Sequence, residues 1–187
     1  YPFYEIRLPT EAGLQPADLV IFSRFPYQTS ALDCPYWECY RRAVDVDVRG
    51  TSVTVINVHI EHSPVLAQKI FDMRIPYGVD DWREQAAIKR LLDDTANWGK
   101  PLLILGDFNT ADRQRGYDLL AQRWGDTWRE RGRGMGMTWT AWRGVMPPML
   151  RIDYIWHSGE FEPLRIHTGQ GISDHRYLLA DFGLNKE

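Results

Sequence analysis

The sequence has little of what marks several common classes of protein. Its 187 residues include only two cysteines, Cys34 and Cys39, whose spacing fits neither a zinc ribbon nor a Cys-x-x-C redox pair. A local disulfide and two free thiols both remain open. No apolar run approaches the ~18 residues that a membrane-spanning helix needs. There is also no internal repeat and no low-complexity linker, so the 44% hydrophobic content predicts one globular domain.

Positive charge is not in excess either. The formal net charge is -3, whereas proteins that coat nucleic acid non-specifically are usually basic. Any contact with nucleic acid is therefore expected to be local. Arg129, Arg131 and Arg133 form a basic run that could make such a contact, but a solvated face has the same pattern.

Short apolar and alternating stretches predict strands, and two stretches predict helices. The helix at 82–98 follows a capping pattern of Asp81 and Glu84, and Gly99 is expected to end it. Residues 61–80 and 132–144 are expected to be loops, the first because it contains Pro64 and Pro76 and has no clear period. The mixture predicts an α+β fold. Expected strands are 19–23, 43–48, 53–60, 102–105, 152–156, 164–168 and 177–182, and the second helix is 117–124.

A carboxylate and an amide follow the buried strand 102–105. Asp107 and Asn109 are two residues apart, and in an extended segment this spacing puts both side chains on the same side. Together they can hold a cation or a phosphate oxygen. An Asx-rich turn at the end of a strand has the same sequence, so the motif alone does not decide.

Two further acidic motifs lie at the starts of later strands. Asp174 is a carboxylate of the type that Mg²⁺ prefers. His175 can take a proton from an attacking water near neutral pH, with Asp153 as the carboxylate that fixes its tautomer. A lone histidine at a strand start is more often structural, so the acidic partner is what supports the catalytic hypothesis.

A second histidine ends the strand 53–60. His59 lies two residues after Asn57, on the same strand face. A hydrogen-bonded structural histidine is one explanation. The other is an imidazole across a scissile phosphate that donates a proton to the developing charge. The expected loops 61–80, with Arg74, and 132–144 are the segments predicted to contact substrate.

Four motifs, in this order, resemble the endonuclease/exonuclease/phosphatase superfamily of DNase I-like proteins. They are Asn57-Val58-His59, Gly106-Asp107-Phe108-Asn109, Arg151-Ile152-Asp153-Tyr154 and Ser173-Asp174-His175-Arg176. The resemblance implies a four-layer α/β/β/α sandwich that hydrolyses phosphate esters with Mg²⁺ or Mn²⁺. It implies that His175 is the general base and Asp153 its orienting partner. It makes Asp174 a metal ligand. It also implies that Asp107 and Asn109 bind the metal and position the nucleophile and the phosphate. His59 becomes a second catalytic histidine, with Asn57 and Arg74 as substrate contacts.

The resemblance covers nearly the whole chain but omits the first strands of the family fold, where a metal-binding Asn and Glu are expected. Residues 1–187 would then be an incomplete domain that begins at Tyr1, about two-thirds of the whole. Uncovered strand edges would favour self-association. Residues 128–153 also resemble a bacterial branch of the family whose members often carry N-terminal membrane spans. The expected location is the bacterial cytoplasm, or outside it if an upstream membrane anchor exists.

The sequence therefore predicts a metal-dependent hydrolase of phosphate esters. Nucleic acid, phospholipid and smaller phosphodiesters all remain as substrates, because one fold serves many of them. The alternative is a non-catalytic scaffold or binding module that retains the fold and its motifs and is inactive as this fragment.

Overall fold

The computed structural model describes residues 1–5, 19–34, 41–63, 65–70, 73–140 and 147–185; for 4–5, 65–70 and 73–79 it describes the backbone alone. Its strands and helices alternate along the chain, which confirms the α+β class. The helices are α1 (Trp82–Asp94), α2 (Arg115–Ala121) and α3 (Thr127–Arg131). The strands are β1 (Phe3–Glu5), β2 (Ile21–Ser23), β3 (Tyr27–Thr29), β4 (Arg41–Val48), β5 (Thr51–His59), β6 (Val65–Ile70), β7 (Met73–Val79), β8 (Leu102–Asp107), β9 (Gly125–Asp126), β10 (Trp139–Thr140), β11 (Pro148–Leu150), β12 (Asp153–His157), β13 (Phe161–Gln170) and β14 (Arg176–Leu184).

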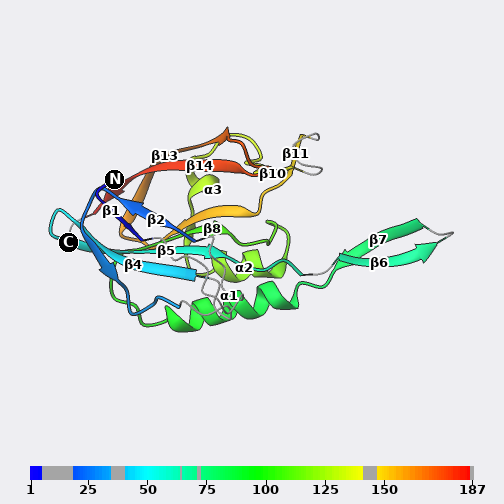
Figure 1. The fold of residues 1–187 in the computed structure, drawn as a ribbon, viewed down its shortest axis with the longest axis horizontal. Helices are drawn as coiled ribbons and strands as arrows, with labels where there is room; N and C mark the ends of the chain where they lie inside the picture. The colour runs from blue at the N-terminus through cyan, green and yellow to red at the C-terminus, as the bar shows by residue number, and fades with distance from the viewer. Residues whose placement is uncertain (6–18, 35–40, 64, 71–72, 141–146, 186–187) are drawn as a thin grey trace.

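A six-stranded sheet in the order β3-β4-β5-β8-β12-β9 is the centre of the molecule. β5 and β8 are parallel, and the other neighbours are antiparallel. Helices α1 and α2 lie on one side of this sheet, and β1, β2, β13 and β14 lie on the other (Figure 1). The described residues thus form a helix layer and two β layers of the expected four-layer sandwich.

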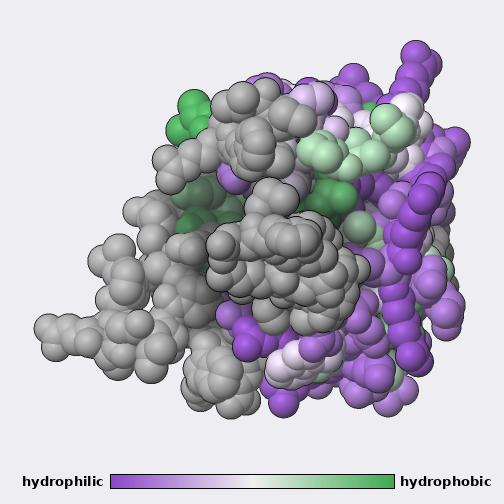
Figure 2. All heavy atoms as spheres, turned by 90° about the vertical axis from the view of Figure 1, so that its right-hand side faces the viewer, coloured by the Kyte–Doolittle hydropathy of each residue, from purple (hydrophilic) through white to green (hydrophobic). Residues whose placement is uncertain are grey.

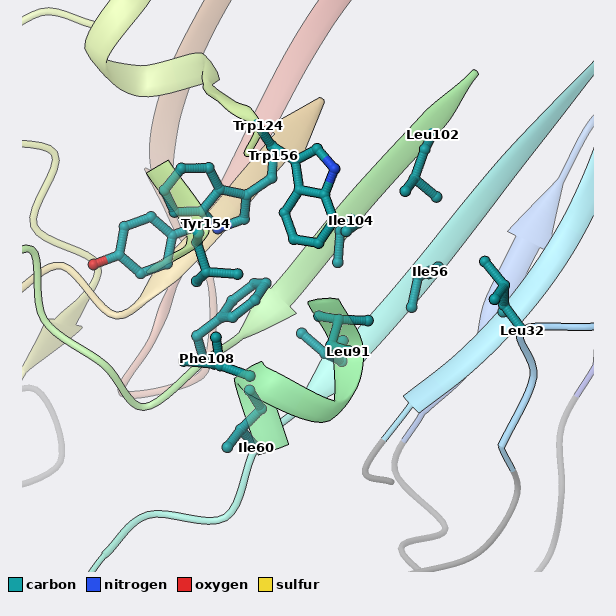
Figure 3. Packing of buried hydrophobic residues seen from close by; sticks show 14 residues of the cluster. Leu32, Ile56, Ile60, Leu91, Leu102, Ile104, Phe108, Trp124, Tyr154 and Trp156 are labelled. Carbon is teal, nitrogen blue, oxygen red and sulfur yellow. The ribbon is translucent and has the colours of Figure 1, made fainter. Parts of the chain in front are cut away.

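The hydrophobic core lies between the central sheet and the helices (Figure 3). Alternate residues of the central strands point to this side, because successive side chains of a strand face opposite ways. Phe108, Tyr154 and Trp156 are at most 1% exposed, and Phe108 packs edge-to-face on Tyr154 at 5.7 Å between ring centroids. Burying each of these rings stabilises the fold by about 2–3 kcal/mol. The other core residues include Ile56, Val58, Ile60, Ile88, Leu91, Leu102, Ile104, Leu120 and Trp124.

Helix α1 is shorter than its sequence predicts and is held differently at its start. It ends at Asp94, where the Thr95 hydroxyl donates to the Leu91 carbonyl at 2.6 Å. Asp81 makes no side-chain capping bond to the helix backbone. Glu84 is buried and accepts hydrogen bonds from the backbone N–H and the hydroxyl of Ser63. Glu84 of the predicted capping pair therefore fastens the helix to the segment that follows β5.

The prediction of a loop over 61–80 is wrong. β6 and β7 form an antiparallel hairpin that projects from the body of the molecule (Figure 1). Pro76 lies opposite Ala67, next to a register shift between Leu66 and Ala67. Proline cannot donate a ladder hydrogen bond and is tolerated at bulges and edges, so a two-stranded hairpin accommodates it.

Several other boundaries and burial patterns differ from prediction. The half-exposed strand expected at 43–48 is buried from Ala43 to Val46. The buried strand expected at 19–23 is only β2, with Phe22 54% exposed. The second helix runs from Arg115 to Ala121 rather than over 117–124.

Three remaining features bear on the sequence predictions. Arg129 pairs with Asp112, and Arg131 donates to the Pro163 carbonyl, so part of the basic run is used within the fold. Cys34 is disulfide-bonded, and Cys39 lies outside the described residues. Within the ranges that the structure describes, no helix has both the length and the apolar character needed to cross a membrane.

Candidate active site

Three of the predicted site residues form a row across the central sheet. His59 ends β5, Asp107 ends β8 and Asp153 begins β12. The register pairs His59 with Asp107 and Asp107 with Asp153. Their strand neighbours Val58 and Tyr154 belong to the core on the helix side, so alternation turns the row toward the second β layer. Figure 2 views the molecule from this end, where hydrophilic residues dominate the right and lower parts of the described surface.

His175 reaches the row from the second β layer. It lies just before β14 and forms an isolated antiparallel bridge with Trp139. Its Nδ1 donates to Asp153 Oδ2 at 2.9 Å, which leaves Nε2 as the acceptor nitrogen. This hydrogen bond raises the pKa of His175, and burial only partly offsets the increase. The structure therefore brings the predicted base and its predicted partner together.

Asp107 lies between the two histidines. Its Oδ2 is 3.9 Å from Nε2 of His59 and 3.9 Å from Nε2 of His175. Burial, followed by the negative charge of Asp153, raises the pKa of Asp107 to about 6. Two carboxylates that repel each other in a half-buried site are the electrostatic setting of a cation site.

Asn109 also contacts Asp107, through the Asx turn that the sequence left open rather than through an extended segment. Its φ of +48° places it in the left-handed region, so the chain turns back after β8. Its backbone N–H donates to Asp107 Oδ1 at 2.8 Å. Its side-chain amide donates to Asp107 Oδ2 at 3.3 Å and to the Ile60 carbonyl at 2.8 Å. Both amide hydrogens are thus used, and the amide oxygen is what Asn109 can offer to a ligand.

Gly106 is required where β8 approaches β5. Its φ is +133°, and a Cβ at this position would lie 2.0 Å from the Val58 carbonyl oxygen. A larger residue would push the strands apart between His59 and Asp107. The glycine therefore sets the spacing of this half of the row.

The structure does not gather the other predicted site residues into this row. Asn57 donates to the Val20 carbonyl at 3.2 Å and so ties β5 to the segment before β2. Asp174 is exposed, and its carboxylate accepts from the Ser173 hydroxyl at 3.2 Å. Arg74 lies opposite Lys69 in the strand register of the projecting hairpin, where the structure describes the backbone alone.

Two structural supports of the site were not singled out from the sequence. The Thr138 hydroxyl accepts a hydrogen bond from the backbone N–H of Asp153 at 3.2 Å. The backbone carbonyl of Thr138 accepts one from the backbone N–H of Arg176 at 2.7 Å. Arg151 is buried, pairs with Asp126 at 2.7 Å and lies over the Tyr154 ring at 4.7 Å. Only the Arg-Ile-Asp-Tyr motif pointed toward Arg151, and a threonine in a Gly-rich stretch gives no comparable signal.

The carboxylates suit a divalent cation. Among the residues described, Asp107, Asp153 and His175 form a group whose potential ligand atoms lie within 4.8 Å of one another. Nδ1 of His175 is already bonded to Asp153, so the available donors are carboxylate oxygens, the amide oxygen of Asn109 and Nε2 of His175. Oxygen donors with room for water suit Mg²⁺ or Mn²⁺ better than Zn²⁺.

The fold is shared with solved structures of low sequence identity. An endonuclease/exonuclease/phosphatase from Beutenbergia cavernae is 24% identical with a TM-score of 0.66, over 97% of this chain and 52% of that one. Beta toxin from Staphylococcus aureus is 17% identical with a TM-score of 0.65, over 97% of this chain and 78% of that one. A mannosyl-6-phosphatase from Bacteroides thetaiotaomicron is 14% identical with a TM-score of 0.55, over 77% of this chain and 56% of that one. No curated protein matches the sequence.

The sequence itself matches one family model over almost its whole length. The match covers residues 2–175 and so includes His59, Asp107, Asp153 and His175. Proteins of this family hydrolyse phosphate esters and generally depend on divalent metals. The chain belongs to the endonuclease/exonuclease/phosphatase family.

Proposed function

We propose that this protein is a Mg²⁺- or Mn²⁺-dependent hydrolase of phosphodiesters in which His175 activates the attacking water. The observation that carries this proposal is the hydrogen bond from His175 Nδ1 to Asp153, together with the nearby Oδ2 of Asp107. In His175 one nitrogen is fixed by Asp153, and the other lies 3.9 Å from a carboxylate oxygen, a separation that one water beside the two atoms can bridge.

Proton transfer follows from this arrangement. A water between His175 Nε2 and Asp107 loses a proton to Nε2 as its oxygen bonds to phosphorus. Asp153 holds the correct tautomer and stabilises the imidazolium that forms. The raised pKa of His175 makes the imidazole a stronger base than a free histidine. Release of the proton to solvent restores the base.

His59 is positioned to complete the reaction. Its side chain is 46% exposed, and its Nε2 lies on the other side of Asp107 Oδ2 from His175. From there it can donate a proton to the leaving oxygen as the phosphorus–oxygen bond breaks. A divalent cation bound by Asp107 and the amide oxygen of Asn109 would stabilise the negative charge on the phosphate.

The test is hydrolysis of bis-p-nitrophenyl phosphate with Mg²⁺, compared between the wild type and His175→Ala. We expect loss of the base to lower kcat by about 10²–10⁴-fold. His167→Ala serves as a control, because His167 is an exposed histidine in β13 and none of the proposed catalytic residues lies in that strand. Equal rates for wild type and His175→Ala would reject the proposal, and no hydrolysis by either protein would favour a non-catalytic scaffold.

A further inference from the structure

A cavity of about 290 Å³ lies between the segment that follows α3 and the strands β11, β13 and β14. In Figure 2 the apolar residues of the described surface gather in its upper part. The cavity walls combine two cationic side chains with large apolar ones: Trp128, Arg133, Met135, Met137, Pro148 and Arg176. None of the proposed catalytic residues lines it.

The positive charge in this cavity has no counter-charge within it. Its lining includes no acidic residue. In the described parts of the chain, neither Arg133 nor Arg176 makes a salt bridge, whereas the neighbouring Arg129 and Arg131 pair with Asp112 and Glu162. Arg176 is half-buried, and a charge that is partly removed from water is unfavourable unless it is paired. The two arginines therefore favour an anionic ligand.

Two polar atoms of the lining residues are shielded from solvent and lack partners. Arg176 Nε and the Thr168 hydroxyl have no hydrogen bond among the described atoms. Thr168 and Arg176 come from the paired strands β13 and β14. A shielded donor without a partner is rare in a folded protein and indicates that a ligand or ordered water completes the site. An anion's oxygen atoms can accept from both groups.

The apolar wall is held rigidly. The Trp128 indole N–H donates to the Gly134 carbonyl at 3.2 Å. Gly136 has a φ of +67°, and a Cβ there would lie 2.5 Å from the indole, so the segment closes tightly around the ring. A fixed aromatic surface beside two arginines suits a phosphate attached to an apolar body better than a free inorganic ion.

The cavity is connected to the catalytic row through Thr138. The Thr138 hydroxyl accepts from the backbone of Asp153, and its carbonyl accepts from the backbone of Arg176. Met137 and Arg176 of the cavity wall are thus direct chain neighbours of Thr138 and His175. The cavity wall therefore lies one residue along the chain from the proposed catalytic histidine.

We propose that this cavity is an anion subsite that binds a second phosphate group of the substrate, carried on an apolar body. The claim that the bound phosphate belongs to the substrate rests on the proposed function. The binding itself does not, because Arg133 and Arg176 take no part in proton transfer. The substrate class is then a phosphodiester whose apolar portion carries a second phosphate group.

The experiment measures binding of phenyl phosphate by calorimetry in EDTA, so that no cation binds phosphate at the carboxylates. We expect Arg133→Gln and Arg176→Gln each to weaken binding about 10-fold or more, as loss of a charge-assisted hydrogen bond predicts. Arg165→Gln is the matched control, since it removes one charge from the outer side of the same strand pair, where Arg165 bonds to Asp181. Inorganic phosphate and phenol, as separate probes, are each expected to bind more weakly than phenyl phosphate.

Different results overturn different parts of the proposal. Equal affinity in the wild type and both glutamine variants, or no binding by the wild type, overturns the subsite. Arg133 is exposed and has no structural partner among the described residues, so its variant remains informative if Arg176→Gln fails to fold. His175→Ala should bind phenyl phosphate like the wild type. If it does so while both proteins hydrolyse phosphodiesters equally, the proposed function fails and the anion site stands.

Discussion

Asp107 offers a direct test of the electrostatics of the row, because the Asp107→Asn substitution should stabilise the metal-free protein while it removes the metal-binding charge. Asparagine keeps nearly the shape of aspartate and can still accept from the Asn109 backbone N–H. It cannot ionise beside Asp153. The expected result is a variant that is more stable than the wild type at neutral pH and inactive.

The magnitude follows from the pKa of Asp107, which burial and then the charge of Asp153 raise from 3.8 to about 6. One pKa unit corresponds to about 1.4 kcal/mol, so ionisation destabilises the metal-free fold by about 3 kcal/mol. The folded pKa lies above the unfolded one. The stability that protonated Asp107 contributes is therefore fully present below about pH 4 and is lost as the pH rises through about 6. The substitution loses the hydrogen bond from the side-chain amide of Asn109 to Oδ2 of Asp107, which costs about 1 kcal/mol. The net gain near neutral pH is about 2 kcal/mol.

The assay is urea denaturation of both proteins in EDTA, followed by circular dichroism, from about pH 4 to about pH 7.5. The variant should be slightly less stable than the wild type at the acidic end and more stable at the neutral end. Saturating Mg²⁺ should reverse the neutral order, because only the wild type gains stability from binding the ion. Parallel pH profiles in EDTA, or a less stable variant at neutral pH, would refute the reasoning.

Asp45→Asn supplies a control of opposite sign. Burial alone raises the pKa of Asp45, but hydrogen bonds from Lys100 and Thr54 outweigh it, so the pKa is lowered below 3.8. This carboxylate contributes stability that is present above 3.8 and lost as the pH falls through the folded value. Asp45→Asn should therefore destabilise the protein at neutral pH, and the penalty should shrink in acid.

Three further substitutions probe the site and its support. Gly106→Ala should lower the free energy of unfolding by about 3 kcal/mol or more in urea titrations, because its Cβ would collide with the Val58 carbonyl; an unchanged midpoint would contradict this. Asp153→Asn should lower kcat by about 10²–10⁴-fold and move the acidic limb of the pH–rate profile to lower pH, because the hydrogen bond to Asp153 raises the pKa of His175; an unmoved limb would exclude this coupling. Phe108→Ala should cost about 3–5 kcal/mol in the same titrations, since the ring is fully buried, and a cost below about 1 kcal/mol would mean that the core collapses around the gap.

The sequence predicted the residues of the row but not their arrangement. His59 and Asp107 could be identified because each lies at the end of an apolar strand-like run, and Asp153 because it lies at the start of one. Their adjacency depends on which strands pair and in which register, and strand pairing is a non-local property that one sequence does not display. The sequence left both an extended segment and a turn open at Asn109, because asparagine after a strand suits both, and the structure shows the turn.

Other features depend on contacts between segments far apart in the chain. Arg133 and Arg176 line one cavity, yet they lie in different parts of the sequence and belong to no common motif. Glu84 resembled a capping residue because its spacing from Asp81 was right, but Ser63 supplies the donors that it accepts. The hairpin of β6 and β7 was concealed by Pro76, whose presence argues against a strand only inside a sheet.

The row of His59, Asp107 and Asp153 restricts how this protein can change. Since the three residues are fixed by strand register, their spacing cannot be adjusted by small steps. A slip of β12 by one residue would turn Asp153 toward the helices and bring a core side chain into the row. Variation in substrate preference is therefore expected in the segments around the row, while the distances between the reacting groups are inherited unchanged.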